Sequence, residues 1–274
     1  MAELPEVETI RRQLVASVAG LRWDGVAARP ASLFRTPAAT VKARLTGARL
    51  GGVQRRGKVL LLLFDRERIL LVHLGMSGQI LLVPPAVPAP GHAHLVATLE
   101  DGRELVFRDP RRFGFFKVAR PAELAGLREL ASVGLDPLDP AQTWEKFLRD
   151  CAARGGAVKP LLMHQGHFAG VGNIYADEIL FASRIRPTRP ASSLNPVEQK
   201  QLFHAIRDIL SAAIEYGGTS FDEAFTDIYG RPGLYGGRLL VYGKEGEPCG
   251  RCNTTLKLAR IGGRSSVFCP HCQR

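Results

Sequence analysis

The spacing of apolar residues first predicts a helix at the start of the chain. Val7, Ile10 and Leu14 recur at helical spacing within residues 5–20. Gly20 follows this segment, and glycine is common just beyond the last turn of a helix. We therefore expect an amphipathic helix over residues 5–20.

From about residue 21 to residue 134 the pattern changes to short apolar segments separated by turn-forming residues. Six segments are interpreted as strands, over residues 59–64, 69–75, 79–83, 94–100, 104–108 and 113–118. Many short strands at close spacing are typical of a β-sandwich or barrel.

Beyond residue 134 the pattern becomes helical. The sequence LDPLDP at 135–140 is interpreted as a linker. Helices are predicted over residues 141–153, 159–164, 172–183 and 195–216. Residues 218–238 are rich in glycine and are expected to form a mobile loop. Strands followed by helices indicate an α+β protein of more than one domain.

Charge and composition narrow the class of protein. The chain has 274 residues and a net charge of +11, from 37 basic and 26 acidic side chains. This excess favours a polyanionic partner, with DNA or RNA ahead of a membrane surface. There is no run of 18 apolar residues and no apolar signal core after Met1, so we expect no membrane span and a cytoplasmic location.

Four of the five cysteines form a candidate metal site near the end of the chain. Cys249 and Cys252 make one C-x2-C pair, and Cys269 and Cys272 make another. Four thiolates at this spacing suit one tetrahedral, structural Zn²⁺, whereas two disulfides do not fit a reducing cytosol. Cys151 stands apart in a predicted helix and is expected to be a buried apolar residue.

The residues between the two cysteine pairs alternate like a β-hairpin. Gly262 and Gly263 can supply its turn, which would place Arg264 at the tip. A guanidinium there can bind a phosphate in bidentate fashion, although Arg264 also fits an ordinary solvated surface position.

A second candidate for phosphate binding lies in the helical region. Gly170 and Gly172 precede Asn173 and a helical pattern. Glycines before a helix allow backbone N–H groups to approach a phosphate closely. Lys159 offers a cation nearby, and the alternative is a solvated lysine.

Several separated motifs together resemble one enzyme family. They are AELPEVET at the start, RRGKVLL and HLGMSGQ within residues 55–79, DPRRFG at 109–114, GVGNIYADE at 170–178 and VYGKEGEPC before the cysteines. In order and spacing they are similar to the formamidopyrimidine-DNA glycosylase and endonuclease VIII family, and closer to its formamidopyrimidine branch.

The resemblance implies a fold that agrees with the strand-then-helix pattern. It consists of an N-terminal β-sandwich with a leading helix, a helix–two-turn–helix domain and a C-terminal zinc-finger β-hairpin. We place these parts at residues 1–134, 135–235 and 236–274.

The resemblance also implies a chemistry in which the enzyme flips a damaged nucleotide out of the duplex. An N-terminal amine, here that of Ala2 after removal of Met1, attacks C1′ of the sugar and forms a Schiff base. Glu3 matches the residue that protonates the ring oxygen, Glu6 a second carboxylate at the sugar, and Lys58 a lysine that contacts phosphate and transfers protons.

DNA-contacting residues are implied in the same way. Met76, Arg111 and Phe113 match the residues that fill the gap left by the flipped base, although Met76 and Phe113 alone would also suit a core. The matches to phosphate contacts are His92, Lys159, Asn173 and Arg264, and Arg264 is also counted with the catalytic group. Ser220 lies in the loop expected to cover the everted base.

Position 2 departs from the family, which has proline there. The secondary amine of proline gives an iminium that always carries a positive charge, whereas the primary amine of Ala2 gives an imine that must first gain a proton. Either the chemistry is weakened, or the pocket keeps the imine protonated. Retention of Met1 would block the amine altogether. A smaller departure is His164, where relatives often carry Asp, and its role is expected to be structural.

Two function classes follow for what is expected to be a monomer. One is a bifunctional glycosylase and AP lyase acting on oxidised purines, such as 8-oxoguanine and formamidopyrimidines, in double-stranded DNA. The other is a protein that binds lesions or abasic sites with little or no catalysis because of Ala2. A general zinc-ribbon nucleic-acid binder is disfavoured by the matched catalytic residues.

Overall fold

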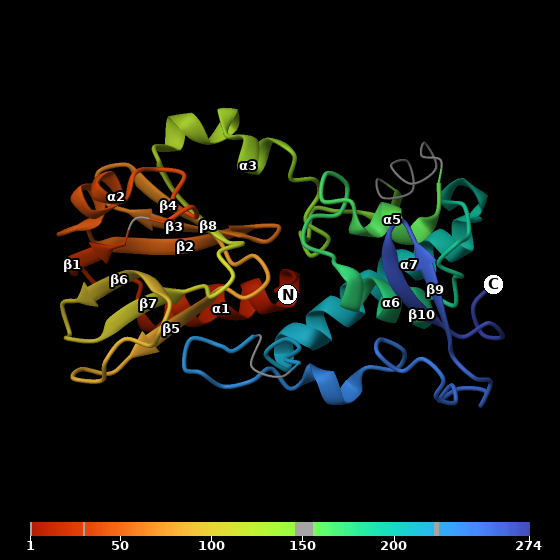
Figure 1. Cartoon of the computed structure of the whole chain (residues 1–274). Coiled ribbons are helices and arrows are strands. Elements are labelled where there is room, and N and C mark those ends of the chain that lie inside the picture. The colour runs from red at the N-terminus through yellow and green to blue at the C-terminus, as the bar shows by residue number, and fades with distance from the viewer. Residues whose placement is uncertain (1, 30, 146–155, 222–224) are drawn as a thin grey trace. The chain divides into compact units, whose positions relative to one another are not determined.

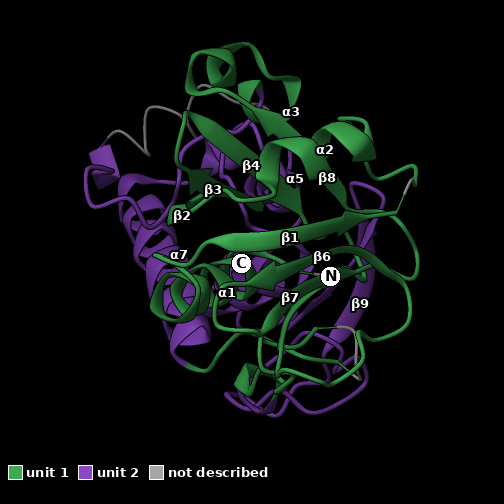
Figure 2. Ribbon diagram, turned by 90° about the vertical axis from the view of Figure 1, so that its left-hand side faces the viewer, with its two compact units in different colours: residues 1–131, 216–236 green, residues 132–215, 237–274 purple. Residues whose placement is uncertain are grey.

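The computed structural model describes residues 2–29, 31–145, 156–221 and 225–274. Cys151 and most of the predicted helix 141–153 lie outside these ranges. The chain forms two compact units (Figure 2). Unit 1 comprises Met1–Ala131 and Tyr216–Gly236, and unit 2 comprises Ser132–Glu215 and Gly237–Arg274. Thus residues 216–235, which the sequence division assigns to the helical domain, group with the strands.

Unit 1 begins with the expected helix, α1 (Leu4–Ser17). Glu3 caps it, because its side chain accepts the backbone N–H of Glu6 while the Glu6 carboxylate accepts that of Glu3. The apolar face packs into the core through Val7, Ile10 and Leu14. The helix ends before Gly20, which adopts a left-handed φ of 92°.

Two antiparallel four-stranded sheets form the sandwich of unit 1 (Figure 1). One has the order β1-β6-β7-β5 and the other the order β2-β3-β4-β8. Their strands are β1 (Trp23–Ala28), β2 (Leu50–Arg56), β3 (Val59–Phe64), β4 (Arg68–His73), β5 (Gln79–Val83), β6 (Ala93–Leu99), β7 (Glu104–Arg108) and β8 (Phe115–Ala119). The predicted sandwich with a leading helix is therefore confirmed.

The unbroken apolar sequence of β3 reflects burial on both of its faces. Leu60 and Leu62 join the core shared with α1 and the other sheet. Leu61 points to the opposite face and packs against Leu127 and Leu130. The latter two come from the region of the short helices η1 (Pro121–Gly126) and α3 (Arg128–Ala131), which cover that face.

Five described elements of unit 1 were not predicted, namely β1, β2, the helix α2 (Ala38–Leu45) and the short helices η1 and α3. The strand β2 has the sequence LGGVQRR, in which glycines and arginines obscure the alternation expected of a strand. It forms because six of its residues pair with the strongly apolar β3. A local sequence pattern contains no information on pairing with a second strand.

Unit 2 contains the helices and the C-terminal hairpin. Its elements are α5 (Val158–Met163), α6 (Asn173–Ala182), η2 (Ala191–Ser193), α7 (Pro196–Glu215), β9 (Lys257–Ile261) and β10 (Arg264–Phe268). The short helix η3 (Tyr235–Arg238) begins in the last two residues of unit 1 and ends in unit 2. Gly262 and Gly263 form the turn of the hairpin with φ of 56° and 77°, as predicted.

The LDPLDP segment is not a free linker, which corrects the sequence interpretation. The backbone N–H of Leu135 donates to the carbonyl of His167, and the Arg207 guanidinium donates to the carbonyls of Pro137 and Asp139. These bonds tie the segment into unit 2, because its carbonyls find a partner on α7.

The segment Tyr216–Gly236 returns to unit 1 and covers an open edge of the sandwich. The backbone N–H of Leu82, on the edge strand β5, donates to the carbonyl of Ile228. Asp227 holds the neighbouring turn by accepting bonds from Tyr229, Arg231 and Gln13. The edge of β5 is thereby paired rather than exposed. Within the described residues, no helix is both long and apolar enough to cross a membrane.

Candidate nucleic-acid interface and metal centre

Two carboxylates are buried at the start of α1. Ala2 is 7% exposed, Glu3 1% and Glu6 0%. The Glu6 carboxylate accepts the backbone N–H of Glu3 at 2.8 Å and that of Thr219 at 2.7 Å. The two glutamates were predicted from the sequence, whereas Thr219, which lies 213 positions away from Glu6 in the chain, was not.

A glycine makes this approach possible. Gly218 has a φ of +85°, and a Cβ built on it would lie 2.8 Å from Oε1 of Glu6. No larger residue fits there without moving the carboxylate. The loop Tyr216–Gly236 is therefore built closely around the N-terminal carboxylates of its own unit.

Two turns of unit 1 present the predicted wedge residues. Met76 is 39% and Phe113 54% exposed, although both are large and apolar. The guanidinium of Arg111 lies 4.8 Å from the centre of the Phe113 ring. All three side chains are thus on the surface rather than in the core, as expected of residues that enter DNA.

Asp109 fixes these two turns against each other. It is fully buried, and its carboxylate accepts Ser77 Oγ at 2.6 Å and the Gly114 N–H at 2.8 Å. A Cβ on Gly75 would lie only 2.5 Å from backbone atoms of Phe113, so the turns touch backbone to backbone. Asp109 belongs to the DPRRFG motif, but its role was not predicted from the sequence.

Lys58 lies beside a half-buried histidine, His73. Lys58 directly precedes Val59, which pairs with His73 across β3 and β4. Burial lowers the pKa of His73 to about 4, and the charges of Lys58 and Arg35 contribute to this fall. The neutral His73 ring accepts the N–H of Gly75 through Nδ1 at 3.1 Å, which connects the surroundings of Lys58 to the turn carrying Met76.

The remaining predicted residues of unit 1 lie in loops. His92 is exposed and has a left-handed φ of 63° just before β6. Ser220 is half-buried, and its hydroxyl donates to the Phe225 carbonyl while accepting the N–H of Gly233. Ser220 therefore shapes its own loop.

In unit 2 the glycine loop before α6 is held by a side chain that sequence reasoning missed. The Gln165 amide oxygen accepts the N–H of Gly170 at 2.9 Å. Its nitrogen donates to the carbonyls of Met163 and Val171 at 2.9 and 2.7 Å. Gln165 thus joins the end of α5 to the loop that leads into Asn173.

Lys159 corrects an expectation. It was matched to a phosphate contact, but its side chain is 0% exposed. Its ammonium lies 2.7 Å from a carboxylate oxygen of Asp177 and donates to the Ser265 carbonyl at 2.6 Å. Burial raises the pKa of Asp177, while the Lys159 charge opposes that rise. With no solvent access, Lys159 is an internal tie between α5, α6 and β10.

Asn173 and Arg264 remain available at the surface of unit 2. Asn173 begins α6, and its Nδ2 lies 3.5 Å from Ser265 Oγ. Its Oδ1 is buried with no hydrogen-bond partner in the described part of the chain. Arg264 is exposed at the hairpin turn, next to Ser265. The Lys159 tie therefore fixes the backbone that carries Arg264 close to the start of α6.

The four cysteines of the hairpin form a single cluster. Their Sγ atoms all lie within 4.8 Å of one another. Burial and the neighbouring thiols raise the pKa of Cys272 to about 12, so four thiolates share this space only when a cation offsets their charge. The backbone N–H groups of Arg251 and Cys272 donate to the sulfurs of Cys249 and Cys269. The donor set fits one structural Zn²⁺.

The sandwich, the helical unit and the four-cysteine hairpin define a multidomain zinc-finger protein. Three family models match in the same order. They describe the formamidopyrimidine-DNA glycosylase N-terminal domain (residues 1–116), the H2TH domain of that enzyme (133–224) and a zinc finger found in FPG and IleRS (246–274).

Individual relatives match over their whole length. A formamidopyrimidine-DNA glycosylase of Methylococcus capsulatus is 42% identical over 100% of both chains. The MutM (Fpg) structure from Thermus thermophilus superposes with a TM-score of 0.88 at 39% identity, covering 99% of this chain and 98% of that one. The Lactococcus lactis Fpg complex with DNA containing an abasic site gives 0.91 at 31% identity and 100% coverage of both chains. The chain belongs to the formamidopyrimidine-DNA glycosylase family.

Proposed function

We propose that the chain is a bifunctional DNA glycosylase and AP lyase that excises oxidised purines from double-stranded DNA. The substrates are 8-oxoguanine and formamidopyrimidines. After the base is removed, the enzyme cleaves the strand at the abasic site. The observation that carries the proposal is the buried pair Glu3 and Glu6, of which Glu3 directly follows Ala2 and Glu6 lies one helical turn further on. The Lactococcus lactis relative was crystallised with abasic DNA, which supports the same substrate class here.

In the proposed reaction the amine of Ala2, freed by removal of Met1, attacks C1′ of the damaged nucleotide. Glu3 passes a proton to the ring oxygen as the sugar opens, and a Schiff base to the protein forms. Lys58 transfers protons during the elimination that breaks the strand. Glu6 holds Glu3 and the Thr219 loop in place through its two accepted N–H bonds.

Ala2 supports this chemistry at a reduced rate. Its primary amine gives an imine that must be protonated before it can accept electrons during elimination. A buried negative charge near the imine favours its protonated form, and we assign this role to Glu6, which lies four positions after Ala2 and is fully buried. The pocket thus compensates in part for the permanent charge that a secondary amine would give.

The proposed DNA contacts use exposed or half-buried residues of each unit. Met76, Arg111 and Phe113 fill the space of the flipped nucleotide. His92, Asn173 and Arg264 contact phosphates, and Ser220 supports the loop over the base. Lys159 is left out of this set because it is buried. We place the activity in the cytoplasm of a bacterial cell, with the protein as a monomer.

Borohydride trapping on duplex DNA carrying 8-oxoguanine or an abasic site tests the proposal. We expect a covalent adduct that maps to Ala2 by peptide mass spectrometry. Ala2→Pro should raise the trapping rate, by about tenfold if the lost iminium charge is worth about 1.4 kcal/mol in the transition state.

The alternative function has a distinct outcome in the same assay. Tight, lesion-selective binding with neither adduct nor strand cleavage would show that the protein binds lesions without acting on them. Intact mass measurement of the N-terminus provides the control, since retained Met1 would exclude amine chemistry at Ala2.

A further inference from the structure

Unit 2 contains a cavity that the proposed DNA chemistry does not use. It has a volume of about 460 Å³ and lies at the cysteine end of the hairpin, away from the turn that carries Arg264. Its lining includes Arg184, Arg251, His271 and Arg274, together with Cys252 and Cys272. Basic side chains and two zinc ligands thus share one open space.

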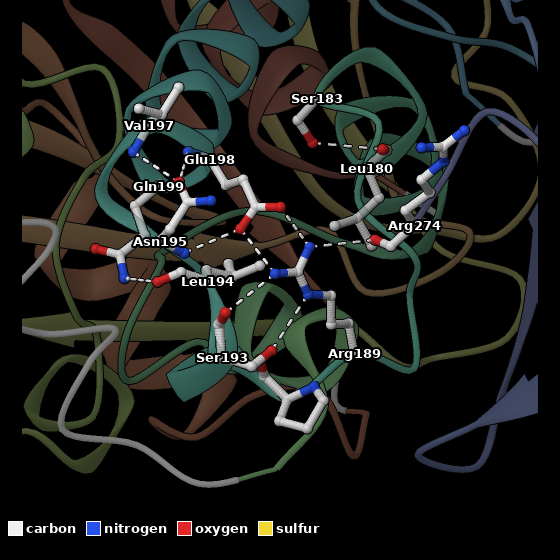
Figure 3. A network of polar contacts seen from close by, with 11 residues as sticks. Leu180, Ser183, Arg189, Ser193, Leu194, Asn195, Val197, Glu198, Gln199 and Arg274 are labelled. Carbon is white, nitrogen blue, oxygen red and sulfur yellow. Dashed lines mark hydrogen bonds and ion pairs between the residues drawn. The ribbon is translucent and has the colours of Figure 1, made fainter.

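The acidic side chain in the cavity wall is already neutralised. Glu198 accepts the Arg189 guanidinium at 2.7 Å and the N–H of Asn195 at 2.9 Å (Figure 3). The hydrogen bond from Arg189 is the main cause that lowers the pKa of Glu198. The charges that a solute meets in the cavity are therefore those of Arg184, Arg251 and Arg274, beside the thiolates.

The four cysteines differ in access. Cys249 and Cys269 are fully buried, whereas Cys252 and Cys272 are partly exposed in the cavity wall. The sulfurs of Cys249 and Cys269 accept backbone N–H groups, which withdraw electron density from a thiolate. Within the described residues, no N–H group donates to Cys272 Sγ. Cys272 therefore combines solvent access with a sulfur that receives no backbone N–H bond within the described residues.

We propose that Cys272, with Cys252 beside it, is a modification site for anionic low-molecular-weight disulfides. The arginines attract the negative charge of such a molecule, and the cavity has room for one half of it. The proposal rests on the cysteine cluster and is independent of the glycosylase reaction.

The chemistry is thiol–disulfide exchange. The Cys272 thiolate attacks one sulfur of the small disulfide, forms a mixed disulfide and expels one small thiolate. A second cysteine thiolate, within 4.8 Å, then attacks Cys272 Sγ and expels the other small thiolate. Two cysteine thiolates are oxidised, the small disulfide is reduced to two thiolates, and Zn²⁺ loses two ligands and leaves.

The test uses the zinc-loaded full chain with oxidised glutathione as the anionic probe and cystamine as a cationic one. Zinc release is followed with a chromogenic chelator, and modified cysteines are mapped by peptide mass spectrometry. We expect mixed disulfides first at Cys272 or Cys252, and zinc release on the same time course.

Substitutions in the cavity separate this site from general thiol reactivity. Arg184→Ala and Arg274→Ala should each slow the reaction with oxidised glutathione by about threefold, because one steering charge is lost, and should not slow the reaction with cystamine. Arg260→Ala, on the exposed side of β9, is the matched control and should change neither rate. Equal modification of all four cysteines, or an unchanged ratio of the two rates in the cavity variants, would overturn the proposal.

Discussion

The ammonium of Lys159 lies 2.7 Å from the carboxylate of Asp177, and both side chains are shut off from solvent. Asp177 also accepts Ser266 Oγ at 2.8 Å and the Val267 N–H at 3.0 Å. One buried ion pair thus joins the helical part of unit 2 to β10. Its neighbour Glu178 accepts the N–H groups of Leu240, Val241 and Tyr242, so α6 holds the zinc finger at two places.

Asp177→Asn is expected to destabilise unit 2 strongly. The change leaves the Lys159 charge buried without a countercharge, which costs about 3–5 kcal/mol of the free energy of unfolding. Urea denaturation at saturating zinc measures this loss. Asp101→Asn, which breaks the surface pair with Arg103, is the control and should cost no more than about 1 kcal/mol. Equal losses in both variants would contradict the internal tie.

Glu8 should make stability depend on pH in the acid range. Burial opposes its ionisation, but hydrogen bonds from Arg11 and Arg55 lower the pKa of Glu8 from 4.5 to about 2. A carboxyl with a lowered folded pKa stabilises the protein above its unfolded pKa, and this stabilisation is lost as pH falls from about 4.5 towards 2. After allowance for solvent screening, we expect about 1–3 kcal/mol.

The measurement for Glu8 compares the free energy of unfolding of the parent and Glu8→Gln between pH 6 and pH 3. The difference should be full at pH 6 and should shrink as pH falls. Glu67→Gln, at an exposed turn, removes the same charge and should show no such trend. A difference for Glu8→Gln that is constant with pH would exclude the proposed linkage.

Gly218→Ala is expected to damage the site at the start of α1. The new methyl group would meet the Glu6 carboxylate at 2.8 Å, and the φ of +85° adds about 1–2 kcal/mol of backbone strain. Gly47→Ala is a matched control, since Gly47 has a φ of +74° with nothing within 4 Å of the added group. Both variants should lose stability, but only Gly218→Ala should also reduce Schiff-base trapping. If Gly47→Ala reduces trapping equally, the contact with Glu6 is not the cause.

Arg264→Ala should weaken DNA binding without regard to sequence. Loss of one phosphate contact lowers the slope of log K against log salt by about one unit. Fluorescence anisotropy over a salt series measures this slope. Lys42→Ala removes an exposed cation from α2 that the proposal does not use, and its slope should match that of the parent. An unchanged slope for Arg264→Ala would remove this residue from the phosphate contacts.

Zinc removal should unfold the hairpin and weaken DNA binding. The buried Cys249 and Cys269 pack with Phe181, Val241 and Val267, so the cluster is also the centre of a small core. A metal-dependent core of this size does not fold without the ion. Chelation or Cys249→Ser should therefore lower affinity, and added zinc should restore the affinity of the chelated parent but not that of Cys249→Ser. Unchanged affinity after proven zinc loss would contradict this expectation.

The local sequence pattern was enough to predict the elements that residues close together in the sequence determine. The α1 helix follows from the spacing of Val7, Ile10 and Leu14, and the hairpin turn from Gly262 and Gly263. The metal site follows from the two C-x2-C pairs, because a zinc ion dictates the spacing of its ligands. These features were predicted with nearly correct bounds.

Structure set by distant partners was missed. Lys159 was interpreted as a surface cation because nothing beside it in sequence reveals Asp177. Glu6 was recognised, but its partner Thr219 was not, since only the fold brings them together. Ala2 shows a further limit, because its consequence depends on reaction chemistry rather than on packing.

The return of Tyr216–Gly236 to unit 1 sets the order in which the newborn chain can mature. When Ala131 leaves the ribosome, every strand of the sandwich has been made, yet the edge of β5 still lacks Ile228 and Glu6 still lacks Thr219. Those partners follow roughly 5–20 s later at ordinary rates of synthesis. Until then the first-made part of the protein carries an open strand edge and a Glu6 carboxylate that accepts the N–H of Glu3 but not yet that of Thr219, and it is most vulnerable to aggregation and proteases during that interval.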